Sequence, residues 1–522
     1  MIRWCENCKY PTKNKICKLC GSRTTLLTEN VIPVFFEEKL LISYIINKDI
    51  TLSQVWNLGK NNYLIDGKKI KVDFNKIMNN EKVLGEISYK VNNTLVEKNN
   101  FIEFTNFKKG NADYLNELII EVHNYINNIV KSYPRHQLIV SWSGGKDSTV
   151  VSDLVKNALG NQKILHIFGD TRMEFPTTYE YYDKFKTKNV FTPFIVAKSD
   201  KDFFELCDIF GPPSRVMRWC CSIFKTGPIS ANFNEIISKD ILTFYGIRRV
   251  ESTARSRYLR TEKSPKISRQ TVSAPIIDWD DFDVWLYIIS RNLEFNKAYR
   301  YGFRRVGCLY CPNNSRWSEF LSSIFFREKY EMWKEYLYNF AQKIGKKDYV
   351  EYINNGNWKA RQGGYGLDTF NTEVKSIDCN LHENAQNYIF DKPITDNLIQ
   401  YLKPLGKMKV IENDGGYKLI ISHIQPEDII VYWDKSSVIV KVIINTDKNV
   451  SLIKQRLECQ LRKYKICILC SACDSVCPVG AISTKGKYTI SEKCIHCGKC
   501  IAHFRGGCLI NKTLYKANKS KI

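Results

Sequence analysis

Sixteen of the 19 cysteines in this chain fall into four groups of four. Most of the intervals within a group are those of metal ligands, because a C-x-x-C pair can direct two sulfurs at one ion or cluster. Thiolates in such groups hold zinc or iron–sulfur clusters, so we expect a protein that binds metals and carries electrons. The groups are Cys5, Cys8, Cys17 and Cys20; Cys220, Cys221, Cys308 and Cys311; Cys467, Cys470, Cys473 and Cys477; and Cys494, Cys497, Cys500 and Cys508.

The last two groups predict a pair of [4Fe–4S] clusters. Residues 467–478 read C-x-x-C-x-x-C-x-x-x-C-P, the run found in bacterial ferredoxins, where the fourth cysteine ligates the other cluster. The second run departs from this pattern, because seven residues rather than three separate Cys500 from Cys508. Two clusters would connect an external electron donor, such as a reductase or a ferredoxin, with an active site. The predicted ligand sets are Cys467, Cys470, Cys473 and Cys508 for one cluster, and Cys494, Cys497, Cys500 and Cys477 for the other.

The first group, with Gly21 directly after its last cysteine, predicts a zinc ribbon or knuckle. A rubredoxin-like iron site is the alternative metal. Such ribbons either fold a chain terminus or contact nucleic acid. Lysines between the cysteines leave the second role open, namely Lys9, Lys13, Lys15 and Lys18.

A phosphate-binding loop is predicted at residues 143–148, which read SGGKDS. The loop follows a short apolar stretch typical of a buried strand, and it opens a helical pattern. Gly144 and Gly145 let backbone N–H groups turn toward phosphate oxygens, and the helix N-terminus adds a favourable dipole. Lys146 supplies a positive charge, and the remaining polar members are Ser143, Asp147 and Ser148.

Further polar residues follow other predicted strands. Asp170 and Glu174 come after the strand KILHIFGD, where carboxylates suit ribose hydroxyls or a magnesium ion. After the strand ILTFYGI, guanidinium groups can grip phosphate or sulfate with two parallel hydrogen bonds. A solvated loop is the alternative for this second group, which comprises Arg248, Arg249, Glu251 and Arg255.

The elements that must position these residues alternate between strand and helix from residue 137 to about residue 300. This alternation predicts an α/β fold with a doubly wound, mostly parallel sheet. Ligands of such sheets bind at the carboxyl ends of the strands. We also expect a helix over 112–131, a β-rich segment over 30–105 and one long helix over 316–345.

Several segments together resemble a known family. SWSGGKDSTVVSDLV is similar to the PP-loop of the ATP pyrophosphatase superfamily, which cleaves ATP between the α- and β-phosphates. FGDTRMEFPTTYEYY, RWCCSIFKTGPI, YGIRRVESTARSRY, PIIDWDDFDVWLYI and FRRVGCLYCP then follow in the order of the phosphoadenosine phosphosulfate (PAPS) reductase family. The resemblance covers residues 137–315 and implies an adenine nucleotide alpha hydrolase-like fold that binds ATP, adenylyl sulfate (APS) or PAPS.

The resemblance also implies roles for cysteines. In adenylyl-sulfate reductases, and similarly in DNA phosphorothioation sulfurtransferases, a C-C pair and a distant C-x-x-C hold a [4Fe–4S] cluster, here Cys220, Cys221, Cys308 and Cys311. Zinc or buried structural thiols are the alternatives at these four residues. Residues 378–383 resemble the E-C-G-L-H motif whose cysteine attacks the sulfate sulfur, although Asn380 replaces the glycine. Cys379 is therefore a candidate nucleophile, and Lys146 and Arg248 are the other two candidate catalytic residues. The alternative is that the resembling motif is only an incidental Cys-His pair.

Two enzymatic functions follow from these motifs. The first is reduction of APS or PAPS to sulfite with electrons relayed by the chain's own clusters. The second is an ATP-dependent sulfurtransferase that adenylates and thiolates tRNA or DNA, which is favoured by the intact Lys146 and Asp147. A non-enzymatic redox sensor that binds nucleic acid is a third hypothesis, which the many active-site motifs disfavour.

Composition and length agree with a multidomain chain. The formal net charge of +24 would attract polyanions, or it reflects lysines scattered over solvated faces. The start of the chain has no apolar signal region and no run reaches the ~20 apolar residues of a membrane span, so we expect a reducing cytoplasm and no membrane. The expected segments are a zinc-ribbon-like knuckle (1–28), a β-rich module (29–110), the PP-loop domain (111–345), a loop-rich segment with Cys379 (346–390), a small α/β module (391–460) and a ferredoxin-type domain (461–522).

Overall fold

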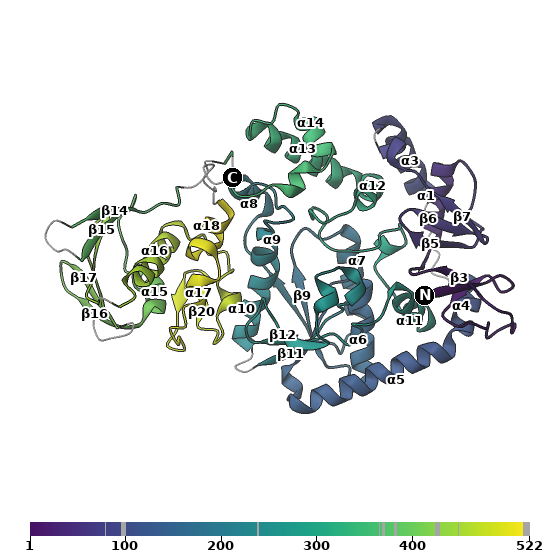
Figure 1. Ribbon diagram of the computed structural model, residues 1–522, viewed down its shortest axis with the longest axis horizontal. Helices are drawn as coiled ribbons and strands as arrows, with labels where there is room; N and C mark the ends of the chain where they lie inside the picture. Colours follow the sequence, from purple (N-terminus) through teal and green to yellow (C-terminus); the bar gives the residue numbers. More distant parts are fainter. Residues whose placement is uncertain are drawn as a thin grey trace.

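The computed structural model describes residues 1–78, 80–94, 101–236, 240–364, 366–367, 371–379, 384–422, 428–446 and 448–514. The molecule is elongated, with the N-terminal modules at one end, an α/β domain in the middle and the C-terminal modules at the other end (Figure 1). None of the described helices is long and apolar enough to cross a lipid bilayer.

A six-stranded sheet forms the middle of the molecule. Its strands are parallel except for one edge strand, β12, which confirms the predicted mostly parallel sheet. In spatial order the strands are β10 (Phe194–Lys198), β9 (Leu165–Asp170), β8 (Leu138–Ser141), β11 (Ile241–Phe244), β13 (Gln270–Ser273) and β12 (Thr261–Lys263).

Alternate residues of the central strands serve two cores. Val140 and Leu242 pack in one core with helix α6 (Lys146–Ala158), whereas Ile139 and Ile241 pack in the other with helix α10 (Gly227–Ile236). Because successive strand residues point to opposite faces, this alternation requires helices on both sides of the sheet. The other helices of the domain are α5 (Ala112–Ile129), as predicted, α7 (Pro176–Lys188), α8 (Phe203–Phe210), α9 (Trp219–Cys221) and α11 (Asp281–Ser290).

The strand order reverses between β8 and β11. From β8 the chain proceeds through β9 to β10 on one side, and it then returns to place β11 on the other side of β8. The loops that leave the carboxyl ends of β8 and β11 therefore separate at this point, which is where open α/β sheets bind their ligands. The predicted phosphate loop follows β8 and the predicted arginine loop follows β11.

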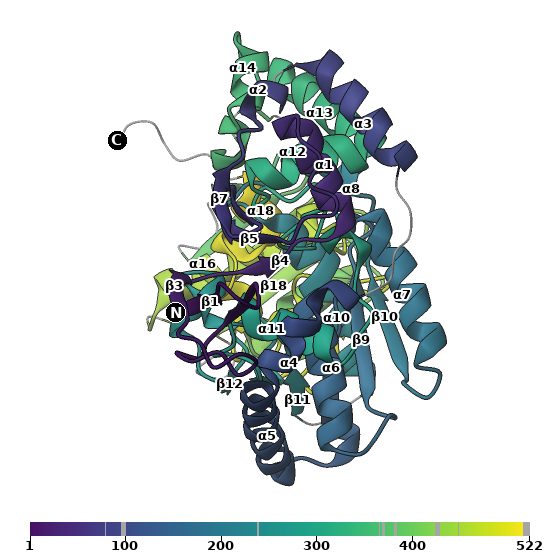
Figure 2. The ribbon, with the colours of Figure 1, turned by 90° about the vertical axis from the view of Figure 1, so that its right-hand side faces the viewer.

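The N-terminal region contains two small sheets and more helix than expected. Its strands are β1 (Ile2–Cys5), β2 (Tyr10–Thr12) and β3 (Thr25–Thr28), then β4 (Ile32–Pro33), β5 (Val55–Gly59), β6 (Asn62–Ile65) and β7 (Lys68–Lys71). The β-rich prediction for 30–105 was wrong over α1 (Phe36–Ile46), α2 (Asn75–Met78), α3 (Glu81–Thr94) and α4 (Thr105–Gly110). In α3 the buried residues recur at helical spacing. Figure 2 shows α1 and α3 beside the helices that follow residue 316.

The single helix predicted over 316–345 is two helices, α12 (Arg316–Phe325) and α13 (Arg327–Lys343), with α14 (Tyr349–Asn354) after them. The break falls at Phe326, whose backbone leaves the helical region at φ −134°. Its ring contacts Phe175, Tyr301 and Phe303, so packing against the α/β domain overrides the helical pattern.

An antiparallel six-stranded sheet lies at the far end. It crosses the boundary predicted at residue 390, because its first two strands lie in the segment expected to be loop-rich. Helices α15 (Leu398–Leu402) and α16 (Val450–Ile466) share a core with its inner face. The order is β14 (Lys375–Asp378), β15 (Ala385–Ile389), β19 (Ile439–Ile444), β18 (Ile429–Asp434), β17 (Gly416–Ser422) and β16 (Lys407–Glu412).

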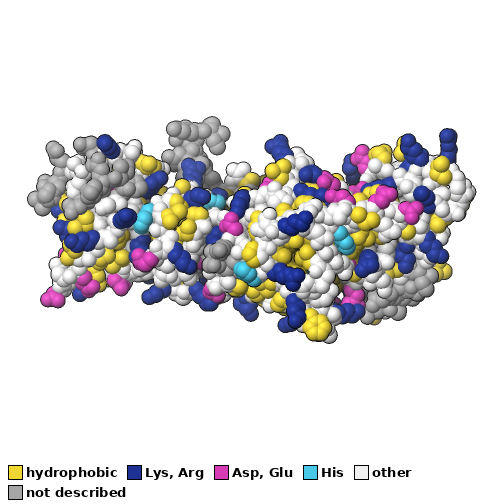
Figure 3. All heavy atoms as spheres, turned by 90° about the horizontal axis from the view of Figure 1, so that it is seen from below, with side chains coloured by type: hydrophobic (Ala, Val, Ile, Leu, Met, Phe, Trp, Pro, Cys, Tyr) yellow, Lys and Arg dark blue, Asp and Glu magenta, His cyan; other side chains and the backbone are white. Residues whose placement is uncertain are grey.

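The last cysteine-rich module occupies the space between this sheet and the α/β domain (Figure 1). It contains β20 (Ile482–Ser483), β21 (Thr489–Ile490), α17 (Lys499–Ala502) and α18 (Leu509–Leu514). On the face drawn in Figure 3, Lys and Arg side chains are spread along the whole molecule rather than gathered in one patch.

Candidate active site and metal centres

Two buried cations and two carboxylates meet at the switch point of the sheet. Lys146 Nζ lies 3.3 Å from Asp147 Oδ2 and 3.5 Å from Asp281 Oδ1. Arg248 Nη2 donates to Asp281 Oδ1 at 2.8 Å, and its Nε lies 2.7 Å from Asp147 Oδ1 without hydrogen-bond geometry. Asp281, at the start of α11, therefore forms ion pairs with Lys146 after β8 and with Arg248 after β11, and so links the two loops.

This arrangement favours the charged forms of Lys146, Arg248 and Asp281. Burial lowers the pKa of Lys146, but Asp147 and Asp281 outweigh it and raise that pKa above its usual value. Burial raises the pKa of Asp281, yet Lys146 and Arg248 bring it down to about 2. Arg248 is 3% exposed, and its Nη1 has no hydrogen-bond partner. A buried donor without a partner costs free energy, so it suits an anion that binds beside the loop.

The backbone of the phosphate loop is held by its neighbours. Gly144 has φ +69°, a conformation that glycine adopts readily and other residues rarely. A Cβ on Gly246 would lie 2.6 Å from the carbonyl carbon of Asp147, so the loop after β11 must pass the phosphate loop without a side chain. The Lys146 backbone N–H donates to Tyr299 Oη at 3.1 Å.

The N-terminal modules also touch this site. Asn30 Nδ2 donates to Asp281 Oδ2 at 3.2 Å, and Lys13 Nζ donates to Asp283 Oδ1 at 2.6 Å. Both acceptors belong to the first turn of α11. The N-terminal region therefore supports the carboxylate that pairs with Lys146 and Arg248.

The other predicted nucleotide residues separate into two places. Glu251 accepts from the Arg248 backbone N–H at 3.1 Å and forms an ion pair with Arg255. Arg249 turns away to pair with Asp278. Asp170 ends β9, where its Oδ1 accepts from Tyr179 Oη at 2.8 Å, and Glu174 lies beside the mid-chain cysteines.

The mid-chain cysteines converge next to the end of β9. Cys308 forms a backbone bridge with Glu174, and its Sγ lies 3.4 Å from Thr171 Oγ1. A hydrogen bond between Cys220 and Cys221 raises the pKa of Cys220 well above its usual value. The same bond lowers the pKa of Cys221 to about 6. Cys220 also interacts electrostatically with Cys308 and Cys311, so the four cysteines lie in one region of the domain.

Cations surround this quartet. Lys225, Lys266 and Arg218 act on Cys221, and each favours its thiolate. Burial lowers the pKa of Lys266, and the neighbouring charges of Arg218, Lys225 and Arg255 lower it further, whereas Cys221 opposes them. Lys266, Lys225, Arg218 and Arg255 thus form a group of positive charges near Cys221, which could attract a compact anion.

The cysteines of the last two groups lie together in the C-terminal module, and their division into two ligand sets stays a prediction. Cys470 interacts with Cys508, Cys473 and Cys467, and burial raises its pKa well above the usual value. Cys494 interacts with Cys477 and Cys497, and Cys500 with Cys473, Cys477 and Cys494. The 19 cysteines, all within the described residues, form no disulfide. Eight cysteines gathered in one small module are a donor set that could hold polynuclear iron–sulfur groups.

The C-terminal module packs directly on the α/β domain. A Cβ on Gly227, six residues after Cys221, would lie 2.7 Å from the Ser471 carbonyl oxygen. The Ser268 backbone N–H donates to the Ser475 carbonyl at 3.3 Å. One hydrophobic core contains Cys508 together with Trp219, and Cys220, Cys308 and Cys470 pack against it. The first ferredoxin quartet and the mid-chain quartet are therefore neighbours.

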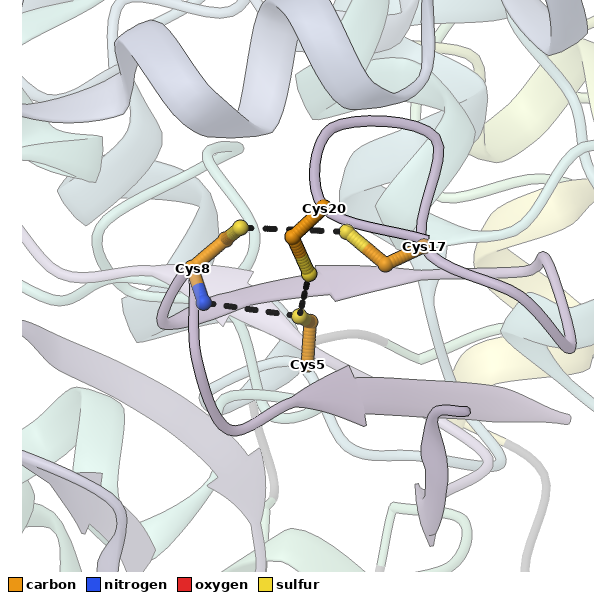
Figure 4. Close-up of side chains that lie close together, drawn as sticks. All are labelled: Cys5, Cys8, Cys17 and Cys20. Carbon is orange, nitrogen blue, oxygen red and sulfur yellow. Dashed lines mark hydrogen bonds between the residues drawn. The ribbon is translucent and has the colours of Figure 1, made fainter. Parts of the chain in front are cut away.

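The N-terminal quartet is compact. Within the part of the chain that the structure describes, it is the one group of His, Cys, Asp and Glu side chains whose ligand atoms all lie within 4.8 Å of one another. The four side chains point toward one another in Figure 4. Sγ–Sγ distances of 3.6 Å (Cys5–Cys20) and 3.8 Å (Cys8–Cys17) match the ~3.8 Å edge of a tetrahedron with ~2.3 Å metal–sulfur bonds. This cluster could bind a single metal ion.

Cys379 is not brought to the nucleotide loop. It follows β14, an edge strand of the far sheet, and its backbone N–H donates to the Ala385 carbonyl at 3.0 Å. The ferredoxin-type module lies between that sheet and the α/β domain (Figure 1). The residues 380–383 that complete the resembling motif, including His382, lie outside the described residues.

Sequence reasoning missed three residues that the structure places at these sites. Asp281 was quoted within DWDDFD but not identified as the partner of Lys146 and Arg248. Tyr299 supports the loop from 153 residues away, and no local pattern signals it. Lys463, a lysine in a helix, gave no sign that it is buried beside Cys500.

Comparisons with known proteins agree with the two parts of this description. Residues 137–314 match the phosphoadenosine phosphosulfate reductase domain, and residues 460–503 match the 4Fe-4S dicluster domain. An uncharacterized protein of Methanocaldococcus jannaschii is 30% identical over 270 residues, which span 48% of this chain and 56% of that protein. The match thus covers little more than half of that relative's length.

Two further matches involve named enzymes. Adenosine 5'-phosphosulfate reductase of Staphylococcus epidermidis is 26% identical over 218 residues, which cover 41% of this chain and 86% of that protein. The solved phosphoadenylyl-sulfate (PAPS) reductase from Candida auris, in a phosphate complex, is 19% identical with a TM-score of 0.30, covering 38% of this chain and 94% of that one. Residues 137–314 of this chain are thus a phosphoadenosine phosphosulfate reductase domain, and residues 460–503 are a 4Fe-4S dicluster domain.

Proposed function

We propose that the chain binds an adenylyl-sulfate compound, APS or PAPS, at the switch point and reduces its sulfate to sulfite. The observation that supports this most is the position of the mid-chain quartet. Its sulfurs lie beside the carboxyl end of β9, a group of four cations surrounds them, and the ferredoxin-type module packs against them. A reductase needs a nucleotide site, an anion site and an electron source in contact with one another.

The nucleotide end of the substrate would lie along the loop at 143–148. Backbone N–H groups at the start of α6 and the unpartnered Nη1 of Arg248 are donors for its phosphate. Lys146, held in place by Asp147 and Asp281, offsets the phosphate charge. Asp170 at the end of β9 is placed for ribose hydroxyls.

The sulfate end would lie among Lys225, Lys266, Arg218 and Arg255. These side chains hold an anion next to Cys221 and stabilise the negative charge that the leaving nucleotide gains. In the reaction the S–O bond to the bridging oxygen breaks, and that oxygen stays on phosphorus. APS, two electrons and one proton give AMP and hydrogen sulfite, while sulfur(VI) becomes sulfur(IV).

Metals complete the proposal. Three [4Fe–4S] clusters, held by the mid-chain quartet and by the two ferredoxin quartets, would supply single electrons from an external donor. A zinc ion in the N-terminal quartet would hold β1, β2 and β3 together.

Zinc removal has a local effect in this account. Stripping the metal or replacing Cys17 with serine is expected to unfold residues 1–28, because structural zinc supplies about 10–16 kcal/mol in isolated fingers. Limited proteolysis should then cut this segment first, and metal analysis should find about one zinc less per chain. An N-terminal segment that stays protected without zinc contradicts the structural role.

Gly227→Ala tests the contact between the two domains. The added Cβ would lie 2.7 Å from the Ser471 carbonyl oxygen and 2.8 Å from the Ser222 carbonyl oxygen, so the ferredoxin-type module or the turn after Cys221 must shift. We expect sulfite formation to slow by up to about 100-fold while nucleotide binding is unchanged, because small misplacements of reacting groups have large kinetic effects. Gly307→Ala, which meets nothing within 4 Å, is the control. Equal rates of sulfite formation in both variants would show that electron transfer does not depend on this contact.

Cys379 has no role in the proposed reaction, because it lies in the far sheet. Cys379→Ser is expected to keep sulfite formation within about twofold of the unchanged protein, as surface substitutions away from a site usually do. Assays of sulfite release measure this directly. A loss of sulfite release with bound nucleotide retained would restore the nucleophile predicted from the sequence.

A second candidate function is an ATP-dependent sulfurtransferase that acts on tRNA or DNA. The observation that favours it is the complete loop, in which Lys146 and Asp147 are both present and joined to Arg248 and Asp281. Anaerobic protein with dithionite and APS or PAPS should release sulfite and AMP in equal amounts. Pyrophosphate release that requires ATP together with nucleic acid, with no sulfite from either sulfate compound, would favour the second function instead.

A further inference from the structure

A lysine is completely buried between the two quartets of the dicluster module. Lys463 lies on α16 and is 0% exposed. Its Nζ donates to the Cys500 carbonyl at 2.8 Å, and its strongest electrostatic partners are the sulfurs of Cys473, Cys500, Cys508 and Cys467. Cys500 belongs to one quartet and the other three to its neighbour, so the ammonium group faces both.

The neighbouring basic residues of the helix behave differently. Arg462 forms an ion pair with Glu458, and Lys465 forms one with Asp391. The ion pairs of the described residues include no carboxylate for Lys463. A buried ammonium group needs an anionic partner, because leaving water without one is strongly unfavourable. In the described surroundings, the groups that act on the Lys463 charge most strongly are the cysteine sulfurs.

Two tyrosines close the same space. Tyr401 and Tyr488 stack with ring centroids 4.2 Å apart, and the Lys463 Nζ lies 5.9 Å from the centre of the Tyr488 ring. Tyr488 is fully buried, and the sulfurs of Cys473, Cys500 and Cys467 act on it. Aromatic rings exclude water here, so the charge of Lys463 is screened little over the distance to either quartet.

We propose that Lys463 sets the reduction potentials of both clusters of the dicluster module through its fixed positive charge. An added electron makes an iron–sulfur cluster more negative, and a cation held nearby stabilises that reduced form. Because one side chain faces both quartets, it raises the two potentials together, which keeps electron transfer between the clusters balanced. The proposal rests on the cysteine quartets of the 4Fe-4S dicluster domain and not on the identity of the substrate.

The test is a redox titration of the purified full-length chain, followed by electron paramagnetic resonance of the reduced clusters. Lys463→Gln removes the charge and keeps a hydrogen-bond donor for Cys500, whereas Lys463→Arg keeps the charge. Lys465→Gln is the matched control, two residues along the same helix but paired with Asp391. We expect Lys463→Gln to lower the potential of both clusters by at least the 59 mV that corresponds to a tenfold change in the ratio of reduced to oxidised cluster. Lys463→Arg and Lys465→Gln should stay near the unchanged protein.

Each outcome decides the question. Equal potentials in Lys463→Gln and in the unchanged protein, at equal iron content, would overturn the proposal. If Lys463→Gln loses iron while Lys463→Arg retains it, the charge is required for the clusters, which supports the proposal. If both variants lose iron, the residue acts by packing and the proposal fails. Failure of sulfite formation with normal potentials would instead reject the proposed reductase activity and leave this inference intact.

Discussion

Cys308→Ser is expected to remove about four iron atoms per chain and to abolish sulfite formation. We expect about twelve iron atoms in the unchanged protein, from three clusters of four. Cys308 is held between Glu174 and Thr171 beside the other three sulfurs, so a serine there removes one ligand from the only quartet in contact with the β9 edge among the described residues. Metal analysis and sulfite assays measure the two effects on the same sample.

The control for this variant is Cys207→Ala. Cys207 is buried in the core shared by the two domains, but it belongs to none of the four quartets. It should therefore keep all its iron and its activity, at a modest cost in stability. Full iron content in Cys308→Ser, or equal iron losses in both variants, would contradict the assignment of the mid-chain quartet as a cluster site.

Arg248→Met is expected to abolish nucleotide binding and to destabilise the fold by up to about 3–5 kcal/mol, because it leaves a partly buried carboxylate pair with one cation instead of two. Asp281, which Lys146 and Arg248 hold at a pKa of about 2, would keep the hydrogen bond from Asn30 but lose the one from Arg248. Urea unfolding gives the change in the free energy of unfolding, and equilibrium binding of AMP gives the affinity.

Arg249→Met is the matched control on the adjacent residue. Arg249 pairs with the exposed Asp278 outside the cluster of buried charges, and such surface pairs contribute about 0–1 kcal/mol. Arg249→Met should therefore keep nucleotide binding and most of the stability. If both substitutions had the same effect, the buried network around Asp281 would not be what organises the site.

Local patterns were enough to predict the centre of the fold. The alternation of apolar strands with helical periodicity gave the mostly parallel sheet, and the glycines before Lys146 marked the turn from β8 into α6. Helical periodicity also predicted a helix over 112–131, where the structure has α5 over Ala112–Ile129. These elements depend on neighbours in sequence, which is why the amino-acid pattern was informative.

The elements that failed depend on distant contacts. Phe326 breaks a long helical pattern because its ring packs on Phe175 and Phe303. Strands β14 and β15 lie in a segment rich in glycine and asparagine, and they are strands because they pair with each other and with β19. No residue pattern within either segment reports such partners.

The candidate site shows the same division. The motifs identified Lys146, Arg248 and the cysteine quartets one by one, because phosphate loops and metal ligands have short spacings. The contacts between these residues in the folded chain could not be predicted from the sequence. That Asp281 joins Lys146 to Arg248, that Gly227 touches Ser471, and that Cys379 lies in another sheet are results of chain topology.

The central claim is that electrons from the cysteine quartets reduce sulfate held in the nucleotide domain. Its most direct test is a single turnover: the protein is reduced anaerobically, excess reductant is removed, and APS or PAPS is added while the cluster absorption and sulfite are followed together. The account predicts that the clusters reoxidise at the rate of sulfite formation, with two electrons lost for each sulfite and AMP released. Clusters that stay reduced in the presence of either sulfate compound, with no sulfite formed, would contradict it.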